Sequence, residues 1–244
     1  MHWMKTCVVI TSVLFASAAR GGEHEKARAP LPTSYTTREI EGWTVRIDDR
    51  LLGGDGAVTG EQAIKLLQAH LLLITTVVSD QPLAKLRAVT IELDLTYGGL
   101  TNMQYHPDSD WLKENGYSEK LAKCVHIPMA KYYLSRYEIH RGPWVILHEL
   151  SHAYHDQVLG FDDARLIAAY KKFRDGGKYK SVLTINGPMR EHYALTNEKE
   201  FFAEMSECYL GTNDFYPFVA GELKRDEPEI YALLQDIWGK LPEK

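Results

Sequence analysis

Two histidines and a glutamate stand close together in the order His-Glu-x-x-His, at positions 148, 149 and 152. The apolar stretch 144–147 leads into them, which favours a helix. Residues four apart share one face of a helix, so His148 and His152 can present two imidazoles to one metal ion. Glu149 lies one step round the helix, beside the open coordination position, where a base for a metal-bound water is needed. The spacing therefore predicts a metal site with its own general base.

A catalytic zinc site usually needs a third protein ligand. A histidine six residues past His152 is one option, but that position is Val158. Asp214, in Gly-Thr-Asn-Asp, is a superficial candidate, and Glu200 is the best one. Segment 197–204 is a predicted helix that carries Glu200 and Glu204 four residues apart, a spacing at which like charges repel.

That repulsion makes sense if Glu200 binds the cation and Glu204 accepts the second N–H of His148, as carboxylates beside metal-bound histidines do. We therefore assign Glu200 as ligand and Glu204 as the partner of His148. The alternative is that both acids only decorate a helix N-terminus, where the helix dipole favours negative charge.

Segment 193–204 reads Tyr-Ala-Leu-Thr-Asn-Glu-Lys-Glu-Phe-Phe-Ala-Glu. It resembles the corresponding segment of the anthrax lethal factor catalytic domain and, more loosely, that of the secreted Pro-Pro endopeptidases. The resemblance covers residues 144–157 and 193–211. It implies a zincin fold of the gluzincin type, with Glu200 as third zinc ligand and Tyr193 stabilising the oxyanion. It also implies an edge strand that lays out the substrate, for which 123–129 is the candidate.

A phenol donor at Tyr193 is chemically sensible, because a peptide carbonyl becomes an oxyanion when it is attacked. The neighbouring His192 is an alternative donor. Together these residues predict a secreted zinc endopeptidase that uses one Zn²⁺ and acts on a peptide or protein. Two alternatives stay open: a non-catalytic zinc-binding domain, closed by Cys208 or Asp214, and a zinc amidase acting on cell-wall peptides.

The N-terminus has the pattern of a secretory signal peptide over residues 1–19, with a short basic start, an apolar run and small residues. The apolar run is too short for a permanent membrane anchor. Polar, proline-containing residues 20–36 read as a linker, and 37–244 as a single metallopeptidase domain. The pattern predicts a secreted or periplasmic protein. In an oxidising compartment Cys124 and Cys208 are either a disulfide or two buried thiols.

Strand patterns come first in the chain and helix patterns dominate later, which favours an α+β fold over alternating β-α units. We expect a small mixed sheet whose edge strand packs on the His148 helix, followed by a helical C-terminal half. The predicted strands cover 39–47, 87–95 and 123–129, and Pro128 places the last one at an edge.

With 28 basic and 33 acidic residues the net charge is −5, so no strong field favours nucleic acid or anionic membrane. The basic stretch 171–180 reads as a solvated helix face and loop. The oligomeric state does not follow from the sequence.

Overall fold

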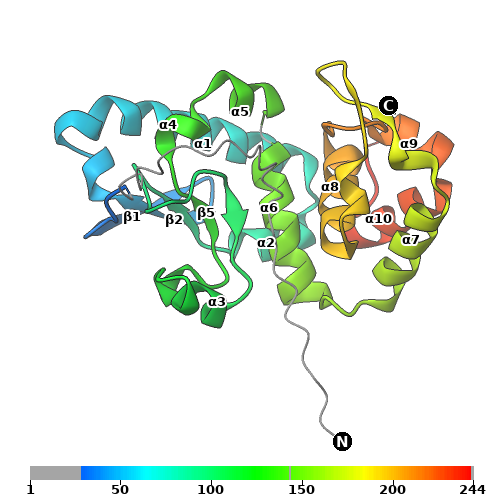
Figure 1. Ribbon diagram of the computed structural model, residues 1–244, viewed down its shortest axis with the longest axis horizontal. Helices are drawn as coiled ribbons and strands as arrows, with labels where there is room; N and C mark the ends of the chain where they lie inside the picture. The colour runs from blue at the N-terminus through cyan, green and yellow to red at the C-terminus, as the bar shows by residue number, and fades with distance from the viewer. Residues whose placement is uncertain (1–28, 143, 243–244) are drawn as a thin grey trace, which may run out of the picture.

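A five-stranded mixed sheet and a set of helices make up the computed structural model, which describes residues 29–142 and 144–242. Figure 1 shows the sheet on the left, a group of helices on the right, and helix α6 (Trp144–Tyr154) between them. One cluster of buried apolar residues extends from Ile40 to Trp238. The predicted α+β architecture, with a helical C-terminal half, is confirmed. The predicted signal peptide lies outside the described residues, as does most of the predicted linker.

The sheet has the strand order β1-β2-β3-β5-β4. Strands β2, β3 and β5 are parallel, while β1 and β4 pair antiparallel at the two edges. The strands are β1 (Tyr35–Ile40), β2 (Trp43–Asp48), β3 (Ile91–Leu93), β4 (Gln104–Tyr105) and β5 (Val125–Ile127).

The segment predicted as one strand, 39–47, is in fact a hairpin of β1 and β2. The chain reverses at Glu41 and Gly42, whose φ angles are 51° and 89°. Two positive φ values in a two-residue turn match the twist of paired strands, and glycine adopts them without strain. The alternation that suggested one strand belongs to β2, where Trp43, Val45 and Ile47 are all buried.

Strand β5 is an interior strand, so the prediction that 123–129 forms an edge is wrong. It lies between β3 and β4, and the edge next to it is β4. Pro128 follows the last residue of β5, Ile127, so its missing N–H removes no hydrogen bond from the ladder. The edge strand was missed because β4 has only two residues and sits in an irregular segment.

Each face of the sheet has its own cover. The apolar face, with Val45, Ile91 and Val125, belongs to the same core as the inner side of α1 (Ala57–Val77). The opposite face is covered by residues 97–123, which include α3 (Ser109–Glu114) and a small apolar cluster of their own. In Figure 1 α1 runs above the sheet and α3 lies below it. A glycine at position 60 brings α1 close to the preceding turn, since a Cβ there would lie 1.9 Å from the carbonyl oxygen of Leu51.

The remaining elements are mainly helical and come mostly after the sheet. The helices are α2 (Asp80–Arg87), α4 (Ala130–Tyr133), α5 (Arg136–Arg141), α7 (Ala164–Asp175), α8 (Glu198–Leu210), α9 (Ala220–Asp226) and α10 (Pro228–Trp238). A π-helical turn, η4 (His155–Leu159), continues α6 up to Gly160. Short 3-10 turns are η1 (Asp49–Leu51), η2 (Gly54–Gly56), η3 (Glu119–Leu121), η5 (Lys178–Lys180) and η6 (Tyr193–Leu195), and a small hairpin pairs β6 (Val182–Leu183) with β7 (Met189–Arg190).

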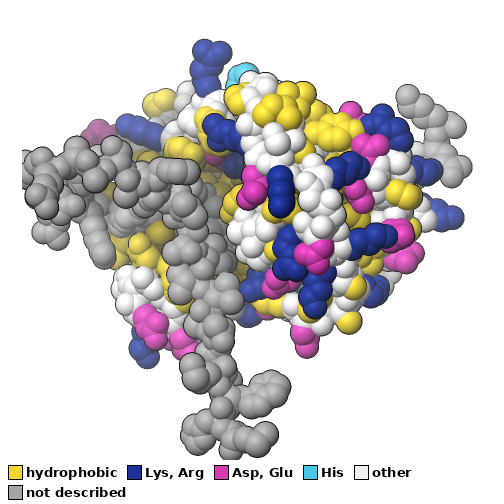
Figure 2. All heavy atoms as spheres, turned by 45° about the vertical axis from the view of Figure 1, so that its right-hand side comes forward, with side chains coloured by type: hydrophobic (Ala, Val, Ile, Leu, Met, Phe, Trp, Pro, Cys, Tyr) yellow, Lys and Arg dark blue, Asp and Glu magenta, His cyan; other side chains and the backbone are white. Residues whose placement is uncertain are grey.

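Charges of both signs share the surface. Figure 2 shows basic and acidic side chains interspersed on the face formed by the right-hand side of Figure 1. The basic stretch 171–180 is largely exposed, and several of its members pair with acids, as Lys172 does with Glu229 at 2.6 Å.

Among the described helices, none is both long and apolar enough to cross a membrane. Cys124 and Cys208 are buried free thiols, which leaves the disulfide alternative unrealised in this structure.

Candidate metal centre

Helix α6 holds the two histidines of the His-Glu-x-x-His sequence against helix α8. Its apolar residues Val145, Ile146, Leu147, Leu150 and Ala153 belong to the core and fix its rotation. Figure 1 shows α6 and α8 running side by side. Helix α8 begins at a firm cap, because the Oδ1 atom of Asn197 accepts from the backbone N–H groups of Lys199 and Glu200, each at 2.9 Å. Core packing and this cap therefore position α6 and α8 without a contribution from a metal ion.

Three donor atoms from these helices come together. The Oε2 atom of Glu200 lies 3.1 Å from Nε2 of His148 and 3.3 Å from Nε2 of His152. His148 and Glu200 are buried, and the side chain of His152 is 13% exposed. Two imidazole nitrogens and one carboxylate oxygen are the donor set of many catalytic zinc sites, which keep one further position open. The three residues fit a zinc ion by the type and proximity of their donors.

No protein-family model, curated protein or solved structure matches this chain. What the site can do therefore follows from its own donors and from the groups around them.

The surroundings of the site favour positive charge. Burial opposes protonation of His148, yet hydrogen bonds to Glu200 and Glu207 raise its pKa well above the ordinary value. Burial likewise acts to raise the pKa of Glu200, but the two imidazoles beside it bring that pKa far below its usual range. Carboxylates that favour a protonated imidazole also favour a cation, which would replace the proton on the nitrogen that faces Glu200.

The second nitrogen of His148 is bound by Glu207, a residue that the sequence did not single out. Its Oε1 atom lies 2.6 Å from Nδ1 of His148, whereas the nearest oxygen of Glu204 lies 3.7 Å away. The assignment of Glu204 as hydrogen-bond partner of His148 is therefore corrected to Glu207. Glu207 is seven residues past Glu200, two turns along the same helix face, and this spacing could have identified it.

Glu204 is as buried as Glu207 but has a different environment. One of its oxygens, Oε2, has no hydrogen-bond partner among the described residues and lies 3.7 Å from Nδ1 of His192. Burial raises the pKa of both Glu204 and Glu207, while the hydrogen bond to His148 acts to lower that of Glu207. The contact of Glu204 with His148 is long, so Glu204 is the poorer acceptor.

These positions predict that Glu207→Gln weakens zinc binding 10- to 100-fold, the usual effect of losing the carboxylate behind a metal-bound histidine. The matched variant Glu204→Gln should change zinc affinity less than about threefold, since its contact with His148 is long. Competition with a calibrated chelator measures both affinities. A larger loss in Glu204→Gln than in Glu207→Gln would restore the original assignment.

Glu149 reaches the site from α6 and is held by the edge strand. Its Oε2 atom accepts the backbone N–H of Tyr105 on β4 at 2.7 Å. Burial raises the pKa of this carboxyl above its ordinary value, against the effect of the two imidazoles nearby. A raised pKa suits a group that has to take up a proton and then release it. The sequence does not point to Tyr105, because the group that holds Glu149 is its backbone N–H and not its side chain.

Tyr193 lies in η6 at the outer side of the site. Its ring centre is 6.4 Å from that of His148, and 43% of the residue is exposed. Burial of the phenol, together with the charges of Glu200 and Glu149, raises its pKa, so the hydroxyl keeps its proton at neutral pH. His192 faces elsewhere: it is buried, stacks on Phe215, and its Nδ1 atom accepts the N–H of Ala194 at 3.1 Å. Of the two candidate donors, Tyr193 is the one placed at the site.

The residues considered as a fourth ligand lie outside the group of three donors. Asp214 accepts a hydrogen bond from Arg141 at 2.7 Å, and Cys208 is part of the hydrophobic core. Neither belongs to a set of donor atoms that includes His152 among the described residues. The geometry thus favours three protein ligands over a closed shell of four.

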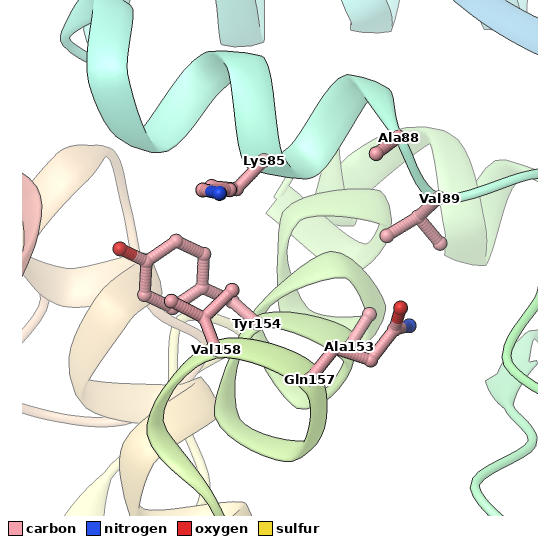
Figure 3. A pocket seen from close by; sticks show the side chains of 7 residues that line it. All are labelled: Lys85, Ala88, Val89, Ala153, Tyr154, Gln157 and Val158. Atoms are coloured by element: carbon pink, nitrogen blue, oxygen red, sulfur yellow. The ribbon is translucent and has the colours of Figure 1, made fainter.

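A pocket on another side of α6 is unrelated to this chemistry. Figure 3 shows it between α2 and the π-helical turn, with Lys85, Tyr154 and Val158 among the residues that line it. It contains neither of the two histidines and no acidic side chain. The candidate metal centre is therefore distinct from the pocket in Figure 3.

Proposed function

We propose that this protein is a zinc-dependent endopeptidase of the gluzincin type, exported from the cell. The observation that carries the proposal is the convergence of Glu200, from α8, on His148 and His152 from α6 within 3.3 Å. A helix spacing alone brings two imidazoles together, but a third donor from a distant segment requires the tertiary fold. The resemblance of segment 193–204 to the lethal factor type of peptidase agrees with this donor set.

A zinc ion bound by these residues would lower the pKa of a coordinated water toward about 7 and polarise a substrate carbonyl. Glu149 would take the proton of the attacking water and pass it to the leaving amine. Its carboxylate is already fixed by the N–H of Tyr105. The hydroxyl of Tyr193 donates to the oxygen that becomes negatively charged.

The sheet supports the same function. An antiparallel edge strand, β4, lies next to α6 and contacts Glu149. An edge strand can bind an extended peptide through backbone groups that are not paired within the sheet; the N–H of Tyr105 is not one of these, because Glu149 accepts it. In the proposed enzyme β4, in place of the predicted 123–129, lays out the substrate beside the metal. The resemblance implied such an edge strand, and the position of β4 beside α6 supports the proposed zincin type.

Digestion of a peptide library with and without a chelator tests the proposal. We expect cleavage that stops with chelator and returns when zinc is added. Zinc binding without any cleavage would instead indicate a non-catalytic domain, and a sulfur ligand in zinc X-ray absorption would contradict an open site. Cleavage confined to cell-wall peptides would favour the amidase alternative.

The phenol of Tyr193 gives a second test. Tyr193→Phe should lower kcat about 100-fold, the typical cost of removing one donor to the oxyanion, and leave zinc affinity unchanged. Tyr137→Phe is a matched control, because Tyr137 is an exposed tyrosine on α5 outside the site. If the two variants have the same kcat, Tyr193 does not stabilise the oxyanion.

A further inference from the structure

A chain of buried polar side chains crosses the sheet on the face opposite to α1. The Oδ2 atom of Asp94, just past β3, lies 2.8 Å from Nε2 of His126 on β5. The other nitrogen of His126, Nδ1, lies 3.2 Å from Nε2 of His106. Asp94 and His126 are 0% exposed and His106 is 3% exposed. We call these three residues the relay.

The relay is a buried hydrogen-bond network in which both imidazoles are neutral. Burial lowers the pKa of His126 to about 4 and that of His106 to about 3. A neutral imidazole has one donor and one acceptor nitrogen. His126 can therefore bond to Asp94 with one nitrogen and to His106 with the other, in either tautomer. Tyr97 meets the His126 ring edge-on at 4.8 Å, and Trp111 stacks on His106, so both imidazoles are shielded.

One end of the relay is attached to strand β4. His106 directly follows β4, and its backbone N–H and C=O are both bonded to the segment before β5, at Cys124 and Lys123. Strand β4 itself has only two residues and one neighbouring strand. Pairing over so few residues is short for a strand, and side-chain contacts can add to what holds it in place.

The other side of β4 faces the metal centre. The N–H of Tyr105 holds the carboxylate of Glu149 at 2.7 Å, and the hydroxyl of Tyr105 donates to Asp156 at 2.6 Å. Strand β4 is thus fixed between α6 on one side and the relay on the other. A shift of β4 moves the backbone group that orients Glu149.

We propose that Asp94, His126 and His106 are positioning residues: they hold β4 in register with α6 and so fix the carboxylate of Glu149 at the metal centre. The catalytic part rests on the function proposed above for Glu149. Catalysis is sensitive to such positions, since a displacement of about 1 Å can cost about 100-fold in rate. None of the three belongs to the donor set of the metal centre, so their effect should appear in kcat with zinc binding intact.

A second metal ion at Glu92, Asp94 and His126 is the competing interpretation, because their donor atoms also lie within 4.8 Å of one another. The contacts favour the relay. Glu92 already pairs with Arg46 and accepts from the hydroxyl of Tyr35 at 2.8 Å, so its charge is balanced by protein groups.

The test compares His126→Gln and His106→Gln with His70→Gln. His70 is a buried histidine on α1 that contacts the hydroxyl of Tyr133 at 2.9 Å, away from β4. Three quantities are measured: amide hydrogen exchange at Tyr105 by NMR, zinc per chain, and kcat. Both relay variants should exchange the Tyr105 amide at least about tenfold faster and lose about tenfold in kcat, with one zinc per chain retained. His70→Gln should lower Tm and change neither exchange at Tyr105 nor kcat.

A pair of variants at Asp94 covers the case in which a histidine variant does not fold. Asp94→Asn keeps an oxygen that can accept from His126 and should keep the parent exchange rate, whereas Asp94→Ala should behave like His126→Gln. Equal Tyr105 exchange in Asp94→Ala and the parent would overturn the proposal. So would a second zinc ion in the parent that Asp94→Ala loses. If the parent cleaves no peptide, the proposed function fails, but the exchange measurement still decides whether the relay holds β4.

Discussion

Glu149→Gln is expected to keep its zinc and to lose about 1,000-fold in kcat/KM, in the middle of the range for a general base. The amide that replaces the carboxylate cannot take the proton of the attacking water. It can still accept the N–H of Tyr105 through its oxygen, so the local structure should persist. Zinc per chain and the rate of peptide cleavage are measured on the same preparation.

Glu92→Gln is the matched control for that variant. Glu92 is also a buried glutamate, but it lies on the polar face of the sheet and pairs with Arg46. It should lose stability without losing the turnover of the folded enzyme. Equal hydrolysis by Glu149→Gln and the parent would remove Glu149 from the mechanism.

Glu200→Ala is expected to lose more than about 100-fold in zinc affinity, and with it the peptidase activity. Losing a carboxylate behind a ligand costs 10- to 100-fold, so losing a ligand should cost more. Two buried imidazoles would remain, without the carboxylate that now lies within 3.3 Å of both. Isothermal titration or chelator competition gives the affinity, and added zinc should restore activity only at concentrations above the new Kd.

Glu198→Ala controls for the loss of an acid from the first turn of α8. Glu198 shares the favourable helix-dipole position of Glu200 but does not contact the histidines. It should bind zinc as the parent does. If Glu200→Ala and Glu198→Ala bind zinc equally, these two acids only interact with the helix dipole at the start of α8, and the proposed metal centre is wrong.

The residues of the candidate site could be predicted from the sequence where their relation is local. His148 and His152 are four apart in a segment with a clear apolar face, and helix geometry places them together whatever the rest of the chain does. Glu200 was proposed from its spacing to Glu204 on a predicted helix, and Tyr193 from the resemblance of segment 193–204 to a known family. The order of strands before helices similarly indicated the α+β architecture.

Only the tertiary structure decided which distant groups meet these residues. The edge of the sheet went to β4 and not to 123–129, because pairing between strands far apart in the chain leaves no local periodicity to read. The partner of His148 became Glu207 because the rotation of α8 against α6 is set by core packing along both helices. The contact of Tyr105 with Glu149 could not be predicted, because a backbone N–H has no residue type to recognise and lies far from Glu149 in the sequence. The same distance in the sequence hides the relay. Both exist because folding brings an edge strand, a sheet face and a helix to one place.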